Sequence, residues 1–311
     1  MQTDLAGVVP ITVTPFDEQG RVDEASIGTL VDCEARWGVH GLNVLGIMGE
    51  AHKLGEGERR RVAELFLEHA AGRLPVVVGT SHGGTGVAVE LSRAAEGAGA
   101  AAVMLAPPPG LRGDAAILAH YRQVAAAISI PIVVQDEPVT TGVLMSAELL
   151  ARIATEVEGC RYVKLEELPT PTKITALRAL PGGDRLRIFG GANGMYFFEE
   201  LSRGAVGIMT GFAFPDVLVE VYDRFRRGDV AGAAAVYDRA ASFIRYEGQP
   251  GIGLALRKEV LRRRGAIAHA VVRPPGPKLD ELTRAELGAI LERLGLESGR
   301  IRPDNGSRIR G

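Results

Sequence analysis

The stretch PIVVQDEPVTTGVLMSAELLARIATEVEGCRYVKLEE, residues 131–167, contains the unit from which this chain is built. Its ends, Pro131–Gln135 and Arg161–Leu165, are short runs rich in apolar residues with little polar alternation. Strands that are buried on both faces of a parallel sheet have this pattern. Between them, Ser146–Glu156 has the amphipathic spacing of a helix. The stretch therefore predicts two parallel strands connected by a helix.

Comparable units continue over the first 227 residues. Short apolar runs predict eight strands, at Gly7–Val13, Gly41–Leu45, Pro75–Gly79, Ala101–Leu105, Pro131–Gln135, Arg161–Leu165, Leu186–Phe189 and Ala205–Met209. Amphipathic segments predict eight helices, at Asp23–Trp37, Glu56–Ala71, Gly84–Gly97, Asp114–Ile128, Ser146–Glu156, Pro171–Leu180, Gly194–Arg203 and Pro215–Arg227. Eight strands that alternate with eight helices predict an α/β protein with a (β/α)8 TIM barrel. The competing doubly wound sheet usually has fewer strands, and its dinucleotide glycine fingerprint is absent here.

The strand pattern stops after Arg227, and helical patterns follow at 229–246, 251–264 and 284–294. We therefore predict a barrel at 1–227 and a C-terminal helical extension of the same domain at 228–297. The remaining residues, 298–311, are rich in Gly, Arg and Asp and predict a flexible tail. The basic run Arg257–Arg264 predicts a solvated helix face or a subunit contact.

Composition excludes several classes of function. The net charge of the 311 residues is −2, so no basic surface indicates a nucleic-acid or anionic membrane partner. The two cysteines, Cys33 and Cys160, exclude a disulfide framework and a multi-cysteine metal site. The sequence shows neither a signal-peptide pattern nor an apolar run long enough for a membrane span. We expect a cytoplasmic protein with no metal and no cofactor.

One lysine has an unusual position. The 36 Lys and Arg residues include five lysines, and Lys164 lies near the end of the sixth predicted strand, whereas we expect the other four in loops or on helix surfaces. A lysine inside an apolar strand is paired or functional, and barrel active sites lie at the carboxyl ends of the strands. Desolvation there favours a neutral amine, which can attack a carbonyl and form a Schiff base. A salt bridge inside the barrel explains the position equally well.

Several motifs occur in the order and spacing of a known family. They are Gly7–Phe16 as its opening strand, Leu45–Glu50 (LGIMGE) as its glycine-containing loop, Pro131–Pro138 followed by Thr141-Gly142, Val163-Lys164 at its Schiff-base lysine, and Gly190-Gly191 with Gly204–Gly207 at its last two strands. From about Gly7 to Leu296 the chain resembles the dihydrodipicolinate synthase/N-acetylneuraminate lyase superfamily of class I aldolases. The resemblance rests on the whole set of motifs, because no single one is decisive.

The resemblance implies a (β/α)8 barrel with C-terminal helices, and a Schiff base between Lys164 and a 2-oxo acid, typically pyruvate. It implies that the backbone N–H groups of Ile47 and Met48 bind the substrate carboxylate, a role that does not depend on side-chain identity. Gly49, Gly191 and Met209 complete the substrate-binding set that we expect from the matched motifs. The family is usually built from dimers into tetramers, so we expect a homo-oligomer, either a dimer or a tetramer.

The chain departs from the family at its proton relay. Ile47, Gln135 and Pro109 stand where the family has hydroxyl-bearing side chains, and none of the three can replace a titrating hydroxyl. Thr140 stands where dihydrodipicolinate synthase has an arginine for its second substrate. We therefore expect a divergent member that is not dihydrodipicolinate synthase itself.

Carboxylates are the candidates to replace the relay, because a carboxyl with a raised pKa can act as general acid or base. Glu166 comes first, since two residues along a strand it shares a face with Lys164. A simple ion pair with the lysine is the alternative role. Asp136 comes second, and Gln135 and Glu137 lie beside it at the end of the fifth predicted strand. A polar strand end before a proline is the alternative explanation of Asp136 and Glu137.

Loop residues add weaker candidates. His52 and His82 lie in the second and third strand-to-helix loops, where they contact substrate or are simply solvated. Glu50 is expected to be structural. Tyr246, Glu247 and Gln249 precede a helix of the extension, where we expect a packed hinge rather than a closure over the site.

The resulting hypothesis is a Schiff-base lyase or aldolase that acts on pyruvate or a related 2-oxo acid. Because Ile47, Met48 and the three prolines from Pro107 make the pocket less polar, we expect a less hydroxylated second substrate than sialic acid. A dehydratase or decarboxylase that uses the same imine is the first alternative. A keto-acid-binding protein that has lost turnover is the alternative of another class.

Overall fold

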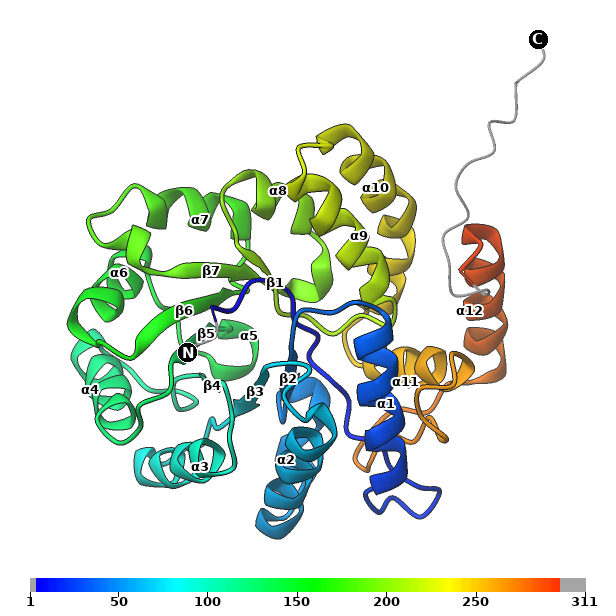
Figure 1. Ribbon diagram of the computed structural model, residues 1–311, viewed down its shortest axis with the longest axis horizontal. Coiled ribbons are helices and arrows are strands. Elements are labelled where there is room, and N and C mark those ends of the chain that lie inside the picture. Colours follow the sequence, from blue (N-terminus) through cyan, green and yellow to red (C-terminus); the bar gives the residue numbers. More distant parts are fainter. Residues whose placement is uncertain (1–3, 297–311) are drawn as a thin grey trace.

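The computed structural model describes residues 4–296 and shows a ring of parallel strands surrounded by helices (Figure 1). The strands are β1 Gly7–Val8, β2 Leu42–Val44, β3 Val76–Gly79, β4 Ala102–Leu105, β5 Ile132–Asp136, β6 Cys160–Leu165, β7 Arg187–Gly190 and β8 Gly207–Ile208. They pair in parallel in the order β1-β8-β7-β6-β5-β4-β3-β2. A parallel bridge between Ile11 and Asn43 joins the two ends of this order. The predicted (β/α)8 barrel is confirmed.

The helices follow the strands around the outside of the ring (Figure 1). They are α1 Glu24–Arg36, α2 Glu56–Ala70, α3 Thr85–Gly97, α4 Asp114–Ala125, α5 Pro138–Thr141, α6 Ala147–Glu156, α7 Thr170–Arg178, α8 Phe197–Ser202, α9 Pro215–Arg226, α10 Val230–Glu247, α11 Gly253–Arg263 and α12 Glu281–Leu294. Four 3₁₀ turns lie between them: η1 Ile47–Gly49, η2 Ala51–Lys53, η3 Gly183–Arg185 and η4 Ala192–Gly194. Helices α10 to α12 form the C-terminal helical extension that was expected.

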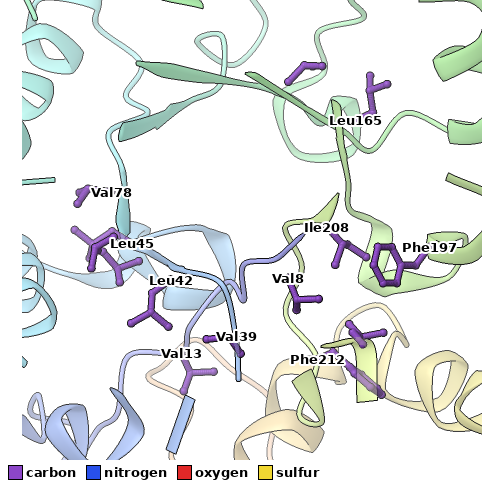
Figure 2. Close-up of a cluster of buried hydrophobic side chains, with 14 of the residues drawn as sticks. Val8, Val13, Val39, Leu42, Leu45, Val78, Leu165, Phe197, Ile208 and Phe212 are labelled. Atoms are coloured by element: carbon purple, nitrogen blue, oxygen red, sulfur yellow. The ribbon is translucent and has the colours of Figure 1, made fainter. Parts of the chain in front are cut away.

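The core has two layers, because successive side chains of a strand point to opposite faces. Inside the ring, a small cluster includes Val133, Tyr162 and Phe189. A larger cluster fills the space between strands and helices, and Figure 2 shows part of it, with Phe197 of α8 beside Ile208 of β8. On β6, Tyr162 belongs to the inner layer, so the same alternation turns Lys164 toward the interior of the ring.

The extension differs from expectation at one helix. Arg257 and Lys258 of α11 are buried rather than solvated, and Lys258 has no exposed surface. The prediction of a solvated face is wrong for these two residues, whereas Arg262 and Arg263 of the same run are exposed. The prediction that Lys258 lies on a helix surface is also wrong. The division into residues 1–227 and 228–297 stays a proposal, and the predicted tail at 298–311 lies outside the described residues. Within residues 4–296, no helix combines the length and apolar character that crossing a bilayer requires.

Candidate active site at the carboxyl ends of the strands

Lys164 and Glu166 form a close pair at the end of β6. The lysine is paired with Gln135 of β5 on one side and Phe189 of β7 on the other, and is 5% exposed. Its Nζ lies 2.7 Å from Oε2 of Glu166. The backbone N–H of Glu166 donates to the carbonyl of Asp136 at 3.0 Å, which extends the pairing with β5 beyond Leu165. The expectation that Lys164 and Glu166 share a face is confirmed.

Two further groups orient the Glu166 carboxylate. Nε2 of Gln135 donates to Oε2 at 3.3 Å, and the backbone N–H of Ala192 donates to Oε1 at 3.2 Å. Gly191 makes room for this arrangement, because a Cβ there would lie 2.4 Å from Cγ of Glu166. Each carboxylate oxygen therefore accepts from one of these donors, and Oε2 is also in contact with the lysine amine.

The LGIMGE stretch folds into the η1 turn beside this pair. Ile47 and Met48 are its first two residues, and the first N–H groups of a helical turn have no partner within the turn. The N–H groups of Gly49 and Glu50 are used internally, since they donate to the carbonyls of Gly46 and Ile47. The arrangement leaves the Ile47 and Met48 amides as the donors that an anion can use.

A cavity of about 390 Å³ joins the turn to the lysine. It is lined by the predicted residues Ile47, Met48, Gln135, Lys164 and Glu166. Its volume lies within the range of small-molecule sites, about 300–1,000 Å³. The structure thus brings five of the predicted residues to one cavity at the carboxyl ends of the strands.

A second cavity, of about 520 Å³, adjoins the first and shares Ile47 and Gln135 with it. His52, His82 and Pro109 line this second cavity and not the first. Burial lowers the pKa of His52, and the neighbouring Lys53 lowers it further. Both histidines are therefore placed beside the lysine cavity and not in contact with the amine.

Three predicted residues lie elsewhere. Met209 is fully buried in the inner core layer, and Gly49 lies inside the η1 turn. Asp136 has no exposed surface and binds Lys173 of α7, whose Nζ lies 2.5 Å from Oδ2. Burial raises the pKa of Asp136 to about 6, against the opposing effect of the Lys173 ammonium. Because Asp136 adjoins Gln135 on the strand, it points to the other face, and we do not retain it as an acid–base candidate.

Three polar residues that the sequence did not indicate also line the lysine cavity: Asn193, Thr210 and Arg257. The first two lie within three residues of the ends of β7 and β8, so the rule that placed Lys164 at a strand end could have identified them. Arg257 lies on α11, where its Nη2 donates to Oδ1 of Asn193 at 2.7 Å and its Nε donates to Glu247 at 2.7 Å. No local sequence pattern distinguishes a helix arginine that lines a cavity from one on the surface.

The segment between α10 and α11 is part of the cavity wall. Glu247 and Gln249 line the cavity, as do Gly248, Pro250 and Gly251. Tyr246 points away, with its hydroxyl 3.2 Å from Oε2 of Glu286. The expectation of a packed hinge therefore holds for Tyr246, whereas Glu247 and Gln249 reach the site. Within residues 4–296, the structure contains no group of three or more His, Cys, Asp or Glu side chains placed to hold a metal ion.

Known proteins resemble the chain over nearly its whole length. Residues 4–294 match the model of the dihydrodipicolinate synthetase family. L-2-keto-3-deoxyarabonate dehydratase from Azospirillum brasilense is 37% identical over 93% of this chain and 94% of its own. The crystal structure of dihydrodipicolinate synthase from Rhodopseudomonas palustris superposes with a TM-score of 0.88 at 39% identity, covering 93% of this chain and 97% of that one. A prophage protein of the dihydrodipicolinic acid synthase family from E. coli K12, solved in complex with pyruvate, gives a TM-score of 0.88 at 25% identity and covers 94% and 99% of the two chains.

Proposed function

The chain belongs to the dihydrodipicolinate synthetase family of lyases, and within it we propose that Lys164 forms a Schiff base with a 2-oxo acid. The observation that carries the proposal is the 2.7 Å contact between the Lys164 amine and Glu166 at the wall of the cavity. A nucleophilic amine needs an adjacent group that can take and return protons, and this carboxylate is such a group. The relative solved with pyruvate supports a 2-oxo acid as the ligand.

The substrate carboxylate binds to the backbone N–H groups of Ile47 and Met48 in this proposal. Two adjacent amides at the start of the η1 turn are suited to a carboxylate, because hydrogen bonds to an ionised acceptor are shorter and stronger than neutral ones. Both residues line the cavity that contains Lys164. The carboxylate and the carbonyl of a 2-oxo acid are adjacent, so one molecule spans the distance from the turn to the amine.

Imine formation uses Glu166 as the proton carrier. Glu166 first takes a proton from the Lys164 ammonium, and the neutral amine attacks carbon 2. The carbon–nitrogen bond forms as the π bond of the carbonyl opens, and one N–H proton of the amine passes to the carbonyl oxygen. That oxygen then leaves as water, with a second proton that Glu166 supplies. The product is a protonated imine, which can accept the electron pair of a neighbouring bond.

We propose dehydration as the reaction that follows, in a 2-oxo acid with a hydroxyl on carbon 4 and two hydrogens on carbon 3. The dehydratase from Azospirillum brasilense supports this class of substrate. Glu166 removes a proton from carbon 3, and the electron pair forms the enamine. The enamine then expels the hydroxyl from carbon 4, which leaves as water with the proton that Glu166 holds. Hydrolysis of the resulting imine consumes one water and frees Lys164, so the net change is the loss of one water.

Aldol cleavage is the second candidate, because it starts from the same imine. Glu166 would instead take the proton of the hydroxyl on carbon 4, and the bond between carbons 3 and 4 would break. An aldehyde leaves, and the remaining enamine is protonated on carbon 3 and hydrolysed to pyruvate. The two reactions are separated by their products, since cleavage releases pyruvate and dehydration does not.

Dihydrodipicolinate synthase activity is not proposed for this chain. Thr140 occupies the position of that enzyme's arginine and lines the cavity, so the arginine that the enzyme uses for its second substrate is replaced at this position. Gln135 replaces the tyrosine of the proton relay and can donate hydrogen bonds but does not titrate. We also propose that the chain is a homo-oligomer, a dimer or a tetramer, which light scattering of the purified protein tests.

Reductive trapping with cyanoborohydride and pyruvate tests the imine directly. We expect a pyruvyl adduct on the Lys164 peptide in the wild type and in Lys278→Ala, a control variant at an exposed lysine. Lys164→Ala is expected to form none. If neither pyruvate nor a panel of other 2-oxo acids is trapped, the imine mechanism fails and a silent keto-acid-binding protein becomes the better explanation. If trapping succeeds, products from 4-hydroxy 2-oxo acids distinguish dehydration from cleavage.

A further inference from the structure

The η1 turn is flanked by two residues whose backbone conformation is unfavourable for side chains other than glycine. Leu45 before it and Glu50 after it have φ of 58° and 55°, in the left-handed region. A non-glycine residue is strained in that region and persists there only where the surroundings hold it. The contacts around the turn therefore determine where the amides of Ile47 and Met48 lie.

The Glu50 side chain is the most heavily bonded group at this turn. It has no exposed surface. Its Oε1 accepts from Nζ of Lys258 at 2.6 Å, and its Oε2 accepts from Nζ of Lys53 at 2.9 Å and from the backbone N–H of Arg273 at 3.0 Å. The donors come from η2, from α11 and from the segment after α11, so Glu50 joins the turn to the C-terminal extension.

Lys258 completes the connection from the other side. Its ammonium also donates to the carbonyls of Thr14 at 2.8 Å and Val271 at 2.7 Å, and lies 4.4 Å from the centre of the Phe16 ring. The hydroxyl of Thr14 in turn donates to the carbonyl of Gly49 at 2.6 Å. Lys258 thus connects to the last residues of the turn by two routes, through Glu50 directly and through Thr14.

We propose that the buried Glu50–Lys258 pair is a positioning device through which the C-terminal helices set the geometry of the carboxylate-binding turn. Neither residue lines either cavity, so both act through the backbone of the turn. The proposal rests on the proposed function, which assigns the substrate carboxylate to the Ile47 and Met48 amides. It makes α11, which lies outside the strand–helix units of the barrel, part of the determinants of substrate affinity.

The double variant Glu50→Gln, Lys258→Met tests this device. It removes both charges together, because removal of one leaves the other buried without its partner. The measurement is the rate of cyanoborohydride trapping against pyruvate concentration. We expect the half-saturating concentration to rise about tenfold, the effect of one lost charge-assisted hydrogen bond, while the rate at saturation stays within about threefold. A purely structural role would lower stability and leave the half-saturating concentration unchanged.

Asp216→Asn is the matched control. Asp216 of α9 binds Arg264 at the end of α11, with 3.0 Å between Oδ2 and Nη2, and has no contact with the turn. The control is expected to lower stability and to leave the half-saturating concentration unchanged. The proposal is overturned if the half-saturating concentration rises equally in the control, or if it does not rise in a folded double variant.

Thr14→Val keeps the test decisive if the double variant does not fold. It removes the hydroxyl bond to Gly49 without burying or exposing a charge, and a rise of about threefold is expected, as for one neutral hydrogen bond. No rise in this variant overturns the device. A wild type that traps no 2-oxo acid overturns the proposed function and the device together, whereas trapping with unchanged half-saturation overturns the device alone.

Discussion

Two buried lysine–glutamate pairs in this molecule have the same chemistry and different surroundings. Lys164 contacts Glu166 at 2.7 Å and borders a cavity, whereas Lys258 contacts Glu50 at 2.6 Å and has no exposed surface. An ammonium has three donors, and Lys258 gives all of them to protein oxygens, those of Glu50, Thr14 and Val271. A lysine whose donors are all used holds structure together, while one that faces a cavity remains available to a ligand.

Lys173 supports the same distinction. Its ammonium donates to Asp136, to Glu167 and to the carbonyl of Met145, and it does not line the lysine cavity. The number of hydrogen bonds to protein and the access to a cavity therefore separate the buried lysines better than burial does. Lys164 differs from Lys173 and Lys258 on both criteria.

The largest expected effect is on turnover, at the pair that faces the cavity. Glu166→Gln retains the shape of the side chain and removes its ability to carry a proton, so turnover of a dehydrated or cleaved substrate should fall about 10²–10⁴-fold. Trapping of pyruvate on Lys164 should be slower but should still occur, because the nucleophile remains. Steady-state kinetics and intact mass of the trapped enzyme check both. Unchanged turnover would exclude Glu166 as the proton carrier.

The next effect is on stability, at the pair that has no access to solvent. Lys258→Met should lower the free energy of unfolding by about 3 kcal/mol, since it leaves Glu50 buried with fewer donors. Lys164→Met should change it by less than about 1 kcal/mol, because the cavity keeps Glu166 in contact with water. Denaturant unfolding of both variants gives the comparison. Equal losses would remove the distinction between the two lysines.

The fold was predictable from local patterns. Each of the eight strands lies inside or within one residue of an apolar run, because a strand buried on both faces needs little more than consecutive apolar residues. Lys164 and Glu166 were predictable from the two-residue period of a strand. The same period turns the Asp136 side chain to the opposite face of β5 from that of Gln135. The orientation of Asp136 could therefore also have been predicted from the sequence.

The buried cations of α11 were not predictable in this way. A basic run indicates a solvated face on average, and Lys258 and Arg257 lie in such a run. Lys258 is paired in the interior with Glu50, which precedes it by 208 residues. The roles proposed for Ile47 and Met48 came from the family resemblance, because no side-chain pattern marks a backbone donor. Long-range contacts, rather than local chemistry, decided these positions.

A smaller effect on turnover is expected at Gly191, which adjoins the side chain of Glu166. Gly191→Ala places a Cβ 2.4 Å from Cγ of Glu166, so the carboxylate must move away from its present contacts. Turnover should fall about tenfold, as expected when a reacting group is shifted by a fraction of an ångström. Gly86→Ala in α3 is the matched control, since its Cβ meets nothing within 4 Å. Equal rates in Gly191→Ala and the wild type would show that Glu166 tolerates displacement.

The smallest effect concerns the pH dependence of the free energy of unfolding, and it arises at the Glu50–Lys258 pair. Burial lowers the pKa of Lys258 to about 8, and the nearby Lys53 and Arg273 add to this against the opposing effect of Glu50. In the unfolded chain, the Lys258 amine keeps its proton up to about pH 10.4. Above pH 8 the unfolded state therefore binds more protons than the folded state, and the free energy of unfolding rises with pH through this group. Between pH 7.5 and 9.0 the wild type should gain about 1 kcal/mol relative to Lys258→Met, measured by urea unfolding at each pH. A constant difference between the two proteins would mean that Lys258 does not titrate in this range.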